Sequence, residues 1–367
     1  MNKKIRIIGA MLLLALWAVL AAFAWLRPSQ EISESERRPL AQFPELSADT
    51  LLSGKFMTGF EDYTLDQFPA RDTFRQIKSL FHYYVLNQRD NNGIYIADGY
   101  AAKLEYPINV DSLEYATGKL NWVYENYLSE SGSKVFFAAV PDKGYYLAEE
   151  NGYLAMDYDA FFGKLQQDIP WATHIDITDC LEIGDYYFTD THWRQERILD
   201  AAQKICQALD MPAPEESEFT QTALERAFYG VYHGQAALPM DPETLYIMKS
   251  DRLDACQVYN YATESYTDVY DMQKLTSKDL YDVYLSGAQS LLRIENPNAA
   301  TDRELIVFRD SFGSSLVPLL VSEYRTVTLV DIRYLSSQLL ERYLEFNGQD
   351  VLFLYSTLVL NNGTTLK

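Results

Sequence analysis

Three residues of this chain, Asp190, His192 and Ser311, are of the types that together activate a nucleophile. His192 is one of only four histidines in 367 residues, and it lies two positions after Asp190 in the run 186-YYFTDTHWRQE-196. A carboxylate at this spacing can hydrogen-bond one ring nitrogen, because positions i and i+2 of an extended or turning backbone can face the same side. That bond fixes the tautomer and stabilises the imidazolium formed when histidine takes a proton from serine. A surface His–Asp pair beside a core Trp193 has the same pattern, so D-x-H alone is ambiguous.

The serine lies in a second run, 304-ELIVFRDSFGSSLVPLL-320, where an apolar strand is predicted to pass directly into a helix at Asp310-Ser311. Such a turn presents the serine hydroxyl at the C-terminal edge of the sheet, where open α/β sheets bind ligands. The N-terminus of the helix offers free N–H groups and a partial positive charge, which would stabilise an oxyanion. This is the arrangement of a nucleophile elbow without G-x-S-x-G. An ordinary helix cap is the alternative, because serine and aspartate are favoured there.

The elements predicted around these two runs alternate between strands and helices. Continuous apolar strands between helices predict an α/β fold, a mostly parallel sheet covered by helices on both faces. The predicted strands lie within 134–144, 173–178, 304–308, 326–330 and 350–356. The predicted helices lie at 112–130, 158–169, 193–209, 312–322 and 335–345, and residues 50–90 are also helical in pattern, with a break at Pro69. The Tyr-rich stretch at about 213–300 is predicted to be an irregular insertion with candidate strands at 245–248 and 256–262.

The N-terminal segment predicts the compartment. Basic residues at the start of the chain precede an apolar run at 7–26, which is long enough to cross a bilayer. Because the positive end stays in the cytoplasm, residues 1–6 are predicted to be a cytoplasmic tail and the remainder to lie outside a bacterial cell membrane. A signal peptide cleaved after Ala24 is the alternative, since Ala22-Phe23-Ala24 has the small-x-small form. The length of the run favours an uncleaved single-pass anchor, followed by a linker at 27–49 and one exported domain at 50–367.

Composition excludes several classes of function. The formal net charge of −21 opposes binding to nucleic acid, and also docking flat on an anionic membrane surface. The three cysteines, Cys180, Cys206 and Cys256, form no C-x-x-C pair, and the histidines show no H-x-x-x-H spacing. We therefore predict neither a metal nor another cofactor. The 28 tyrosines suit a sugar-facing or partner-facing surface, and equally the rim of a core.

The same runs carry a family resemblance. The chain resembles the DHHW family of exported bacterial proteins and, more distantly, the SGNH-like O-acetyltransferase domains of the alginate acetylation machinery. The resemblance rests on the D-x-H-W run with the preceding 175-IDITDCL-181, and on the elbow 309-RDSFG-313. It extends to 36-ERRPLAQFPELS-47, 61-EDYTLDQFPARD-72 and 139-AVPDKG-144, and so covers nearly the whole exported part. Thr191 departs from the family name, since it stands where the first histidine of D-H-H-W would be.

The resemblance implies an SGNH-hydrolase-like α/β domain in which Ser311 is the nucleophile, His192 the base and Asp190 the orienting acid. It also implies acetyl groups on cell-surface or secreted polysaccharide as the substrate class. We therefore predict a membrane-anchored extracytoplasmic serine O-acetyltransferase, or an acetylesterase, that works through an acetyl-serine intermediate. Because export separates the domain from cytoplasmic acetyl-CoA, a membrane-bound acyl-transporting partner is a further hypothesis. The alternative is a non-catalytic polysaccharide-binding or assembly protein on the same scaffold.

Three further residues are predicted to border the substrate. Lys143 follows a predicted strand on the same edge as the elbow, and it would bind an anionic sugar or polarise a carbonyl unless it is a solvated loop lysine. Trp193 would wall the site and limit water. Gly230, in 228-FYG-230, and the neighbouring His233 would lie near the site.

Other polar residues near these motifs are predicted to have lesser parts. Asn361 and Asn362 follow the last strand and are candidates for the oxyanion hole, to which SGNH-type sites add a backbone N–H and an asparagine. Arg194 is expected to pair with an acid in its own helix and not to touch substrate.

Overall fold

The computed structural model describes residues 3–33 and 35–367, which form two compact units. The first unit consists of the residues up to Asn92 together with His233–Pro239. The second consists of Gly93–Tyr232 and Met240–Lys367. The candidate chemical residues all belong to the second unit, apart from His233.

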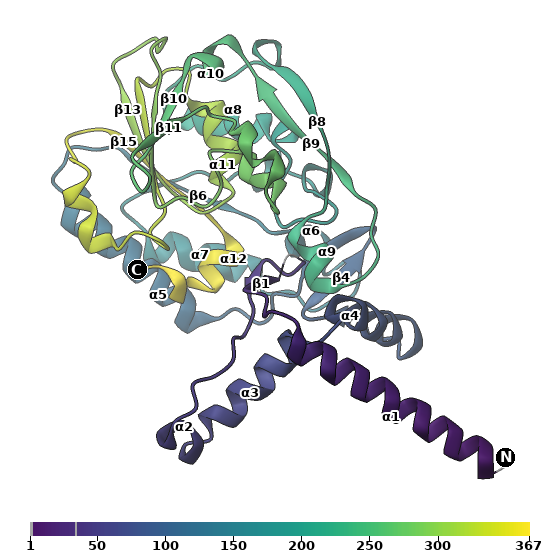
Figure 1. The fold of residues 1–367 in the computed structure, drawn as a ribbon. Coiled ribbons are helices and arrows are strands. Elements are labelled where there is room, and N and C mark those ends of the chain that lie inside the picture. The colour runs from purple at the N-terminus through teal and green to yellow at the C-terminus, as the bar shows by residue number, and fades with distance from the viewer. Residues whose placement is uncertain (1–2, 34) are drawn as a thin grey trace. The chain divides into compact units, whose positions relative to one another are not determined.

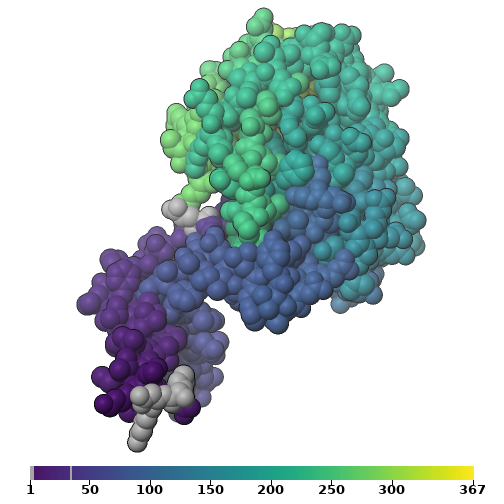
Figure 2. Space-filling model, turned by 90° about the vertical axis from the view of Figure 1, so that its right-hand side faces the viewer, coloured from purple at the N-terminus to yellow at the C-terminus, as the bar shows by residue number. Residues whose placement is uncertain are grey.

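The first unit is mainly helical (Figure 1). Its helices are α1 (Lys3–Leu26), α2 (Ala48–Leu52), α3 (Lys55–Asp66) and α4 (Arg71–Leu80), the last continued by a π-helical turn at Phe81–Val85. Strands β1 (Ile32–Ser33) and β2 (Arg38–Pro39) form a short antiparallel pair, and β3 spans Asp90–Asn91. Within the described residues, α1 is the one helix long and apolar enough to cross a membrane. Its side chains lie at the surface, in purple in Figure 2.

An eight-stranded sheet organises the second unit, in the order β11-β10-β12-β14-β13-β15-β6-β7. The strands are β6 (Val135–Val140), β7 (Thr173–His174), β10 (Gln257–Asn260), β11 (Ser265–Thr267), β12 (Leu291–Glu295), β13 (Glu304–Arg309), β14 (Thr326–Val330) and β15 (Asp350–Ser356). Neighbouring strands run parallel from β14 to β7 and antiparallel from β11 to β14. The mostly parallel sheet predicted from the apolar runs is therefore confirmed.

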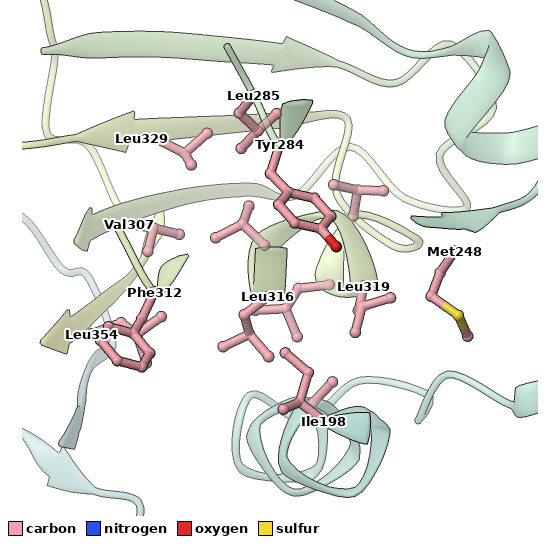
Figure 3. Packing of buried hydrophobic residues seen from close by; sticks show 14 of the residues in the cluster. Ile198, Met248, Tyr284, Leu285, Val307, Phe312, Leu316, Leu319, Leu329 and Leu354 are labelled. Carbon is pink, nitrogen blue, oxygen red and sulfur yellow. The ribbon is translucent and has the colours of Figure 1, made fainter. Parts of the chain in front are cut away.

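Helices cover both faces of this sheet, which gives the expected three layers. They are α5 (Val110–Val123), α7 (Tyr158–Asp168), α8 (Leu199–Ala208), α11 (Gly313–Leu316) and α12 (Thr357–Asn361). Leu305 and Val307 of β13 pack in one core cluster with α8 and α11, which Figure 3 shows around Leu316. The alternate residues Ile306 and Phe308 pack in a second cluster with α5, α7 and α12. Because both sides of the strand are buried, its sequence is a continuous apolar run.

Several elements differ from the predicted ones. The helix expected at 312–322 is α11 followed by a 3₁₀ turn at Val317–Leu320, because Pro318 has no N–H to continue an α-helix. The helix expected at 335–345 is a 3₁₀ turn at Ser337–Arg342, and the strand expected at 173–178 is only the two-residue β7. The helix expected at 193–209 begins as a 3₁₀ turn at Gln195–Arg197 before α8.

The stretch at about 213–300 is more regular than predicted. It contains the hairpin of β8 (Thr220–Phe228) and β9 (Glu243–Lys249), and the strands β10, β11 and β12 that extend the central sheet. The remaining elements of the chain are β4 (Ile94–Ala97), β5 (Tyr100–Lys103), α6 (Lys143–Leu147), α9 (Val231–Ala236), α10 (Asp251–Ala255), a π-helical turn at Tyr124–Leu128, and 3₁₀ turns at Thr178–Cys180, Ile183–Asp185, Glu216–Glu218, Met272–Thr276, Leu280–Val283 and Gly363–Thr365.

Candidate active site

Ser311 lies in the turn between β13 and α11, at the C-terminal edge of the parallel strands. The buried side chain of Asp310 holds this turn, since its two oxygens accept from the N–H groups of Phe312, at 2.9 Å, and Ser356, at 2.7 Å. Ser311 is not a helix cap, because the N-cap position is Phe312 and no side chain caps it. Within the described residues the Ser311 N–H has no hydrogen-bond acceptor. The partly exposed hydroxyl and this N–H are therefore both available to a ligand.

His192 connects the serine to the acid. Its Nε2 lies 2.8 Å from Ser311 Oγ, and its Nδ1 lies 2.5 Å from Asp190 Oδ1. An ionised carboxylate can only accept, so Nδ1 carries the proton and Nε2 is left to accept from the serine hydroxyl. His192 is 7% exposed and Asp190 is fully buried, which excludes most water from these bonds. The structure thus brings together the three residues that the sequence singled out, in the order that proton transfer requires.

The backbone around Gly230 holds the acid in place. Asp190 Oδ2 accepts from the Val231 N–H at 2.8 Å, and the Gly230 N–H donates to Thr189 Oγ1 at 2.9 Å. A Cβ at Gly230 would lie only 2.3 Å from the backbone N and Cα of Asp190. Glycine is needed here because the two chain segments approach too closely for any side chain. Gly230 thus lies against Asp190, and the substrate contact that we expected of it stays a prediction.

A stacked tyrosine, which sequence reasoning missed, supports the histidine. The Tyr281 ring lies parallel to the His192 ring, with centroids 3.9 Å apart and planes 8° apart. The buried Tyr281 hydroxyl lies 2.7 Å from Ser315 Oγ, and the Trp193 Nε1–H donates to the same oxygen at 2.9 Å. Tyr281 is one of 28 tyrosines, and no spacing sets it apart from the others.

Lys143 is buried beneath the site, only 2% exposed. Its Nζ donates to the carbonyl oxygen of Tyr187 at 2.9 Å and lies over the rings of Tyr100 and Tyr232. Burial lowers the pKa of this amine to about 7, although Asp190 and other acids oppose the shift. Burial rules out the solvated loop lysine that we considered as the alternative. The role of Lys143 in binding substrate stays a prediction.

The other predicted residues have structural partners. Trp193 is fully buried and packs against Phe312, and its expected role in walling the site stays a prediction. Asn361 accepts from the Asn109 N–H at 2.8 Å and donates to Glu105, which places its side chain at the start of α5. The neighbouring amide group of Asn362 donates to the Leu358 carbonyl at 2.9 Å. Arg194 precedes the 3₁₀ turn Gln195–Arg197 and pairs with Glu196 of that turn at 2.8 Å, where we expected an acid of its own helix. Within the described residues, no group of three or more His, Cys, Asp or Glu could hold a metal ion.

The fold is a three-layer α/β protein built on a mostly parallel sheet, and the comparisons with known proteins find the same kind of fold. The family model of the DHHW protein matches residues 181–330, a range that contains both the D-x-H-W run and the elbow. The predicted resemblance to the DHHW family is therefore confirmed. No curated protein matches the chain.

Solved structures show the same fold. A DHHW family protein from Eubacterium siraeum is 23% identical, with a TM-score of 0.61, over 75% of this chain and 94% of its own. Bacillus cereus PatB1, solved with a sulfonyl adduct, is 18% identical, with a TM-score of 0.57, over 73% of this chain and 95% of its own. The O-acetyltransferase domain of Pseudomonas putida AlgJ is 15% identical over 73% of this chain and 92% of its own, with a TM-score of 0.44.

Proposed function

We propose that this chain is an extracytoplasmic serine O-acetyltransferase, or an acetylesterase, that acts on cell-surface or secreted polysaccharide. The observation that carries the proposal is the hydrogen-bonded series Ser311–His192–Asp190, at 2.8 Å and 2.5 Å. A serine hydroxyl is a weak nucleophile, and a histidine oriented by a buried acid is the usual means of activating it. In this proposal α1 anchors the chain in the membrane and the rest lies outside.

The geometry accounts for both halves of the reaction. Ser311 Oγ attacks the acetyl carbonyl carbon while its proton passes to His192 Nε2, and Asp190 stabilises the resulting imidazolium. The oxyanion that forms accepts from the Ser311 N–H. Collapse of the intermediate breaks the bond to the leaving oxygen, which takes the proton from His192 and leaves acetyl-Ser311. A sugar hydroxyl, or water in the esterase case, then attacks this ester, and the same proton transfers in reverse release Ser311.

The acetyl donor requires a partner in this proposal. A domain outside the cytoplasm has no access to acetyl-CoA, so a membrane-bound acyl-transporting protein would deliver the acetyl group. Transfer by the purified chain from a soluble donor alone, at the full rate, would show that no such partner is needed.

The test is an intact-mass measurement on the full-length chain in detergent after exposure to an activated acetyl ester. Wild type should gain one acetyl group, mapped to Ser311, and Ser311→Ala and His192→Ala should gain none. His174→Ala is the matched control, because His174 is a partly exposed histidine at the edge strand β7 and should leave acetylation unchanged. Added glycans then distinguish a transferase from an esterase.

A sulfonyl fluoride provides a second probe, since the PatB1 structure carries a sulfonyl adduct and such reagents modify activated nucleophiles. If folded wild type gains neither an acetyl nor a sulfonyl group, the chemistry proposed for Ser311 is wrong. The non-catalytic polysaccharide-binding protein would then be the better hypothesis.

A further inference from the structure

Helix α4 of the first unit packs through its polar side. Ser79 is fully buried, and its hydroxyl donates to the Ala236 carbonyl at 2.8 Å. One turn earlier, Arg75 donates to the Gly234 carbonyl at 3.0 Å and pairs with Glu36 at 3.1 Å. These residues recur at i and i+4, so one face of the helix is occupied by polar contacts within its own unit.

The opposite face of the same helix is apolar and exposed. The side chains form a stripe that continues into the π-helical turn, and their exposed fractions run from 48% to 69%. We call this set the α4 stripe: Phe74, Ile77, Phe81, Tyr84 and Val85. A surface helix of a soluble protein has the reverse arrangement, with its apolar side inward. A contiguous exposed apolar patch of this kind marks a surface that meets another apolar phase.

The start of the α4 stripe is linked to α1 through aromatic rings. The ring centroids of Phe74, at the start of the stripe, and Phe68 are 5.4 Å apart. The ring centroids of Phe68 and Trp17 in α1 are 6.4 Å apart. Phe74 and Phe68 also line a hollow of about 1420 Å³ with Leu13, Leu16 and Trp17 of α1, and most of the remaining lining is charged or polar. The stripe and the helix long enough to cross a membrane therefore meet through these apolar side chains, next to a polar part of the first unit.

We propose that the α4 stripe is buried in the bilayer that α1 crosses, so that the first unit binds the membrane at a second place. An amphipathic helix with aromatic residues on its apolar side binds membranes in this way, and Tyr84 suits the level of the headgroups. Because the chain carries a net charge of −21, the contact rests on apolar burial and not on attraction to anionic lipid. The inference is independent of any chemistry at Ser311.

The experiment uses the full-length chain with Cys180→Ser, reconstituted in phosphatidylcholine vesicles with or without phosphatidylglycerol. An environment-sensitive fluorophore is attached at Ile77→Cys, at Tyr84→Cys or, as a control, at Asp72→Cys. Asp72 lies on the same helix outside the stripe, with its side chain 57% exposed. Two quenchers are compared, a spin-labelled lipid within the bilayer and aqueous iodide.

Labels at the two stripe positions should be quenched by the lipid quencher and protected from iodide several-fold relative to the label at Asp72, in both lipid compositions. Equal access of iodide to all three labels would overturn the proposal. Protection of the stripe labels from both quenchers would also overturn it, because protein and not lipid would then cover the stripe. Circular dichroism confirms that each labelled variant is folded, and α1 keeps every variant in the vesicles whichever result is obtained.

Discussion

Gly230→Ala tests how the orienting acid is held. The added methyl group would lie 2.3 Å from both the backbone N and Cα of Asp190. Non-bonded heavy atoms are most stable about 3.5–4.0 Å apart, so the two segments must separate by roughly 1 Å or more. Both contacted atoms belong to the backbone and cannot move aside as the end of a flexible side chain does.

This displacement moves Asp190 and so disturbs the hydrogen bond between Asp190 Oδ1 and His192 Nδ1, which is 2.5 Å long in the native chain. A misplacement of about 1 Å in an active site costs about 10²-fold in rate, so kcat for hydrolysis of an acetyl ester should fall about 100-fold. Overpacking also costs about 1–3 kcal/mol of stability. The assay is the initial rate of ester hydrolysis, measured well below the melting temperature of the variant.

Gly118→Ala is the matched control for this substitution. Gly118 is exposed in the middle of α5, and a Cβ there would meet nothing within 4 Å. Alanine is the better helix former by about 1 kcal/mol, so this variant should melt higher and keep the wild-type kcat. A folded Gly230→Ala with the wild-type kcat would refute the reasoning, because the acid would then not depend on the close approach of the two segments.

Three further predictions concern residues that act on or near His192. Asp190→Asn should lower kcat by about 10³–10⁴-fold, since the amide favours the wrong tautomer, and a loss below tenfold in steady-state kinetics would contradict this. Tyr281→Leu should lower kcat about tenfold with KM unchanged, because an aromatic stack is worth about 0.5–1.5 kcal/mol. Tyr281→Phe retains the ring and should keep the wild-type kcat. Equal losses of kcat in both variants would point to the hydroxyl instead. The pKa of Lys143 falls to about 7 in the folded chain from its usual value of 10.5. Between these two pH values the unfolded chain binds more protons than the folded chain, so the stability of wild type rises with pH. The melting temperature of wild type should therefore increase relative to that of Lys143→Met as the pH rises from 7 to 10. A pH-independent difference between the two melting curves would show that Lys143 keeps its ordinary titration.

Much of the fold was predictable because many of its strands and helices depend only on short stretches of sequence. A strand buried on both faces must be apolar throughout, and β6, β13 and β15 are recognisable for that reason. Boundaries were less predictable where a local feature competed, as Pro318 does by ending α11 early. The strands in 213–300 were only partly predicted, since β8, for example, is mostly exposed and so has no continuous apolar run in its sequence.

The sequence by itself determined the types and local spacing of the three candidate residues, because a D-x-H run and a strand-to-helix turn each depend only on neighbours in the chain. Only the tertiary structure decided which other residues support them. Tyr281 stacks on His192 and Gly230 approaches Asp190 through contacts between distant segments. Lys143 follows a strand as predicted, yet the burial that lowers the pKa of its amine comes from rings elsewhere in the chain. Such contacts depend on how the elements pack. The sequence around an individual tyrosine, glycine or lysine does not indicate which distant residue it will contact.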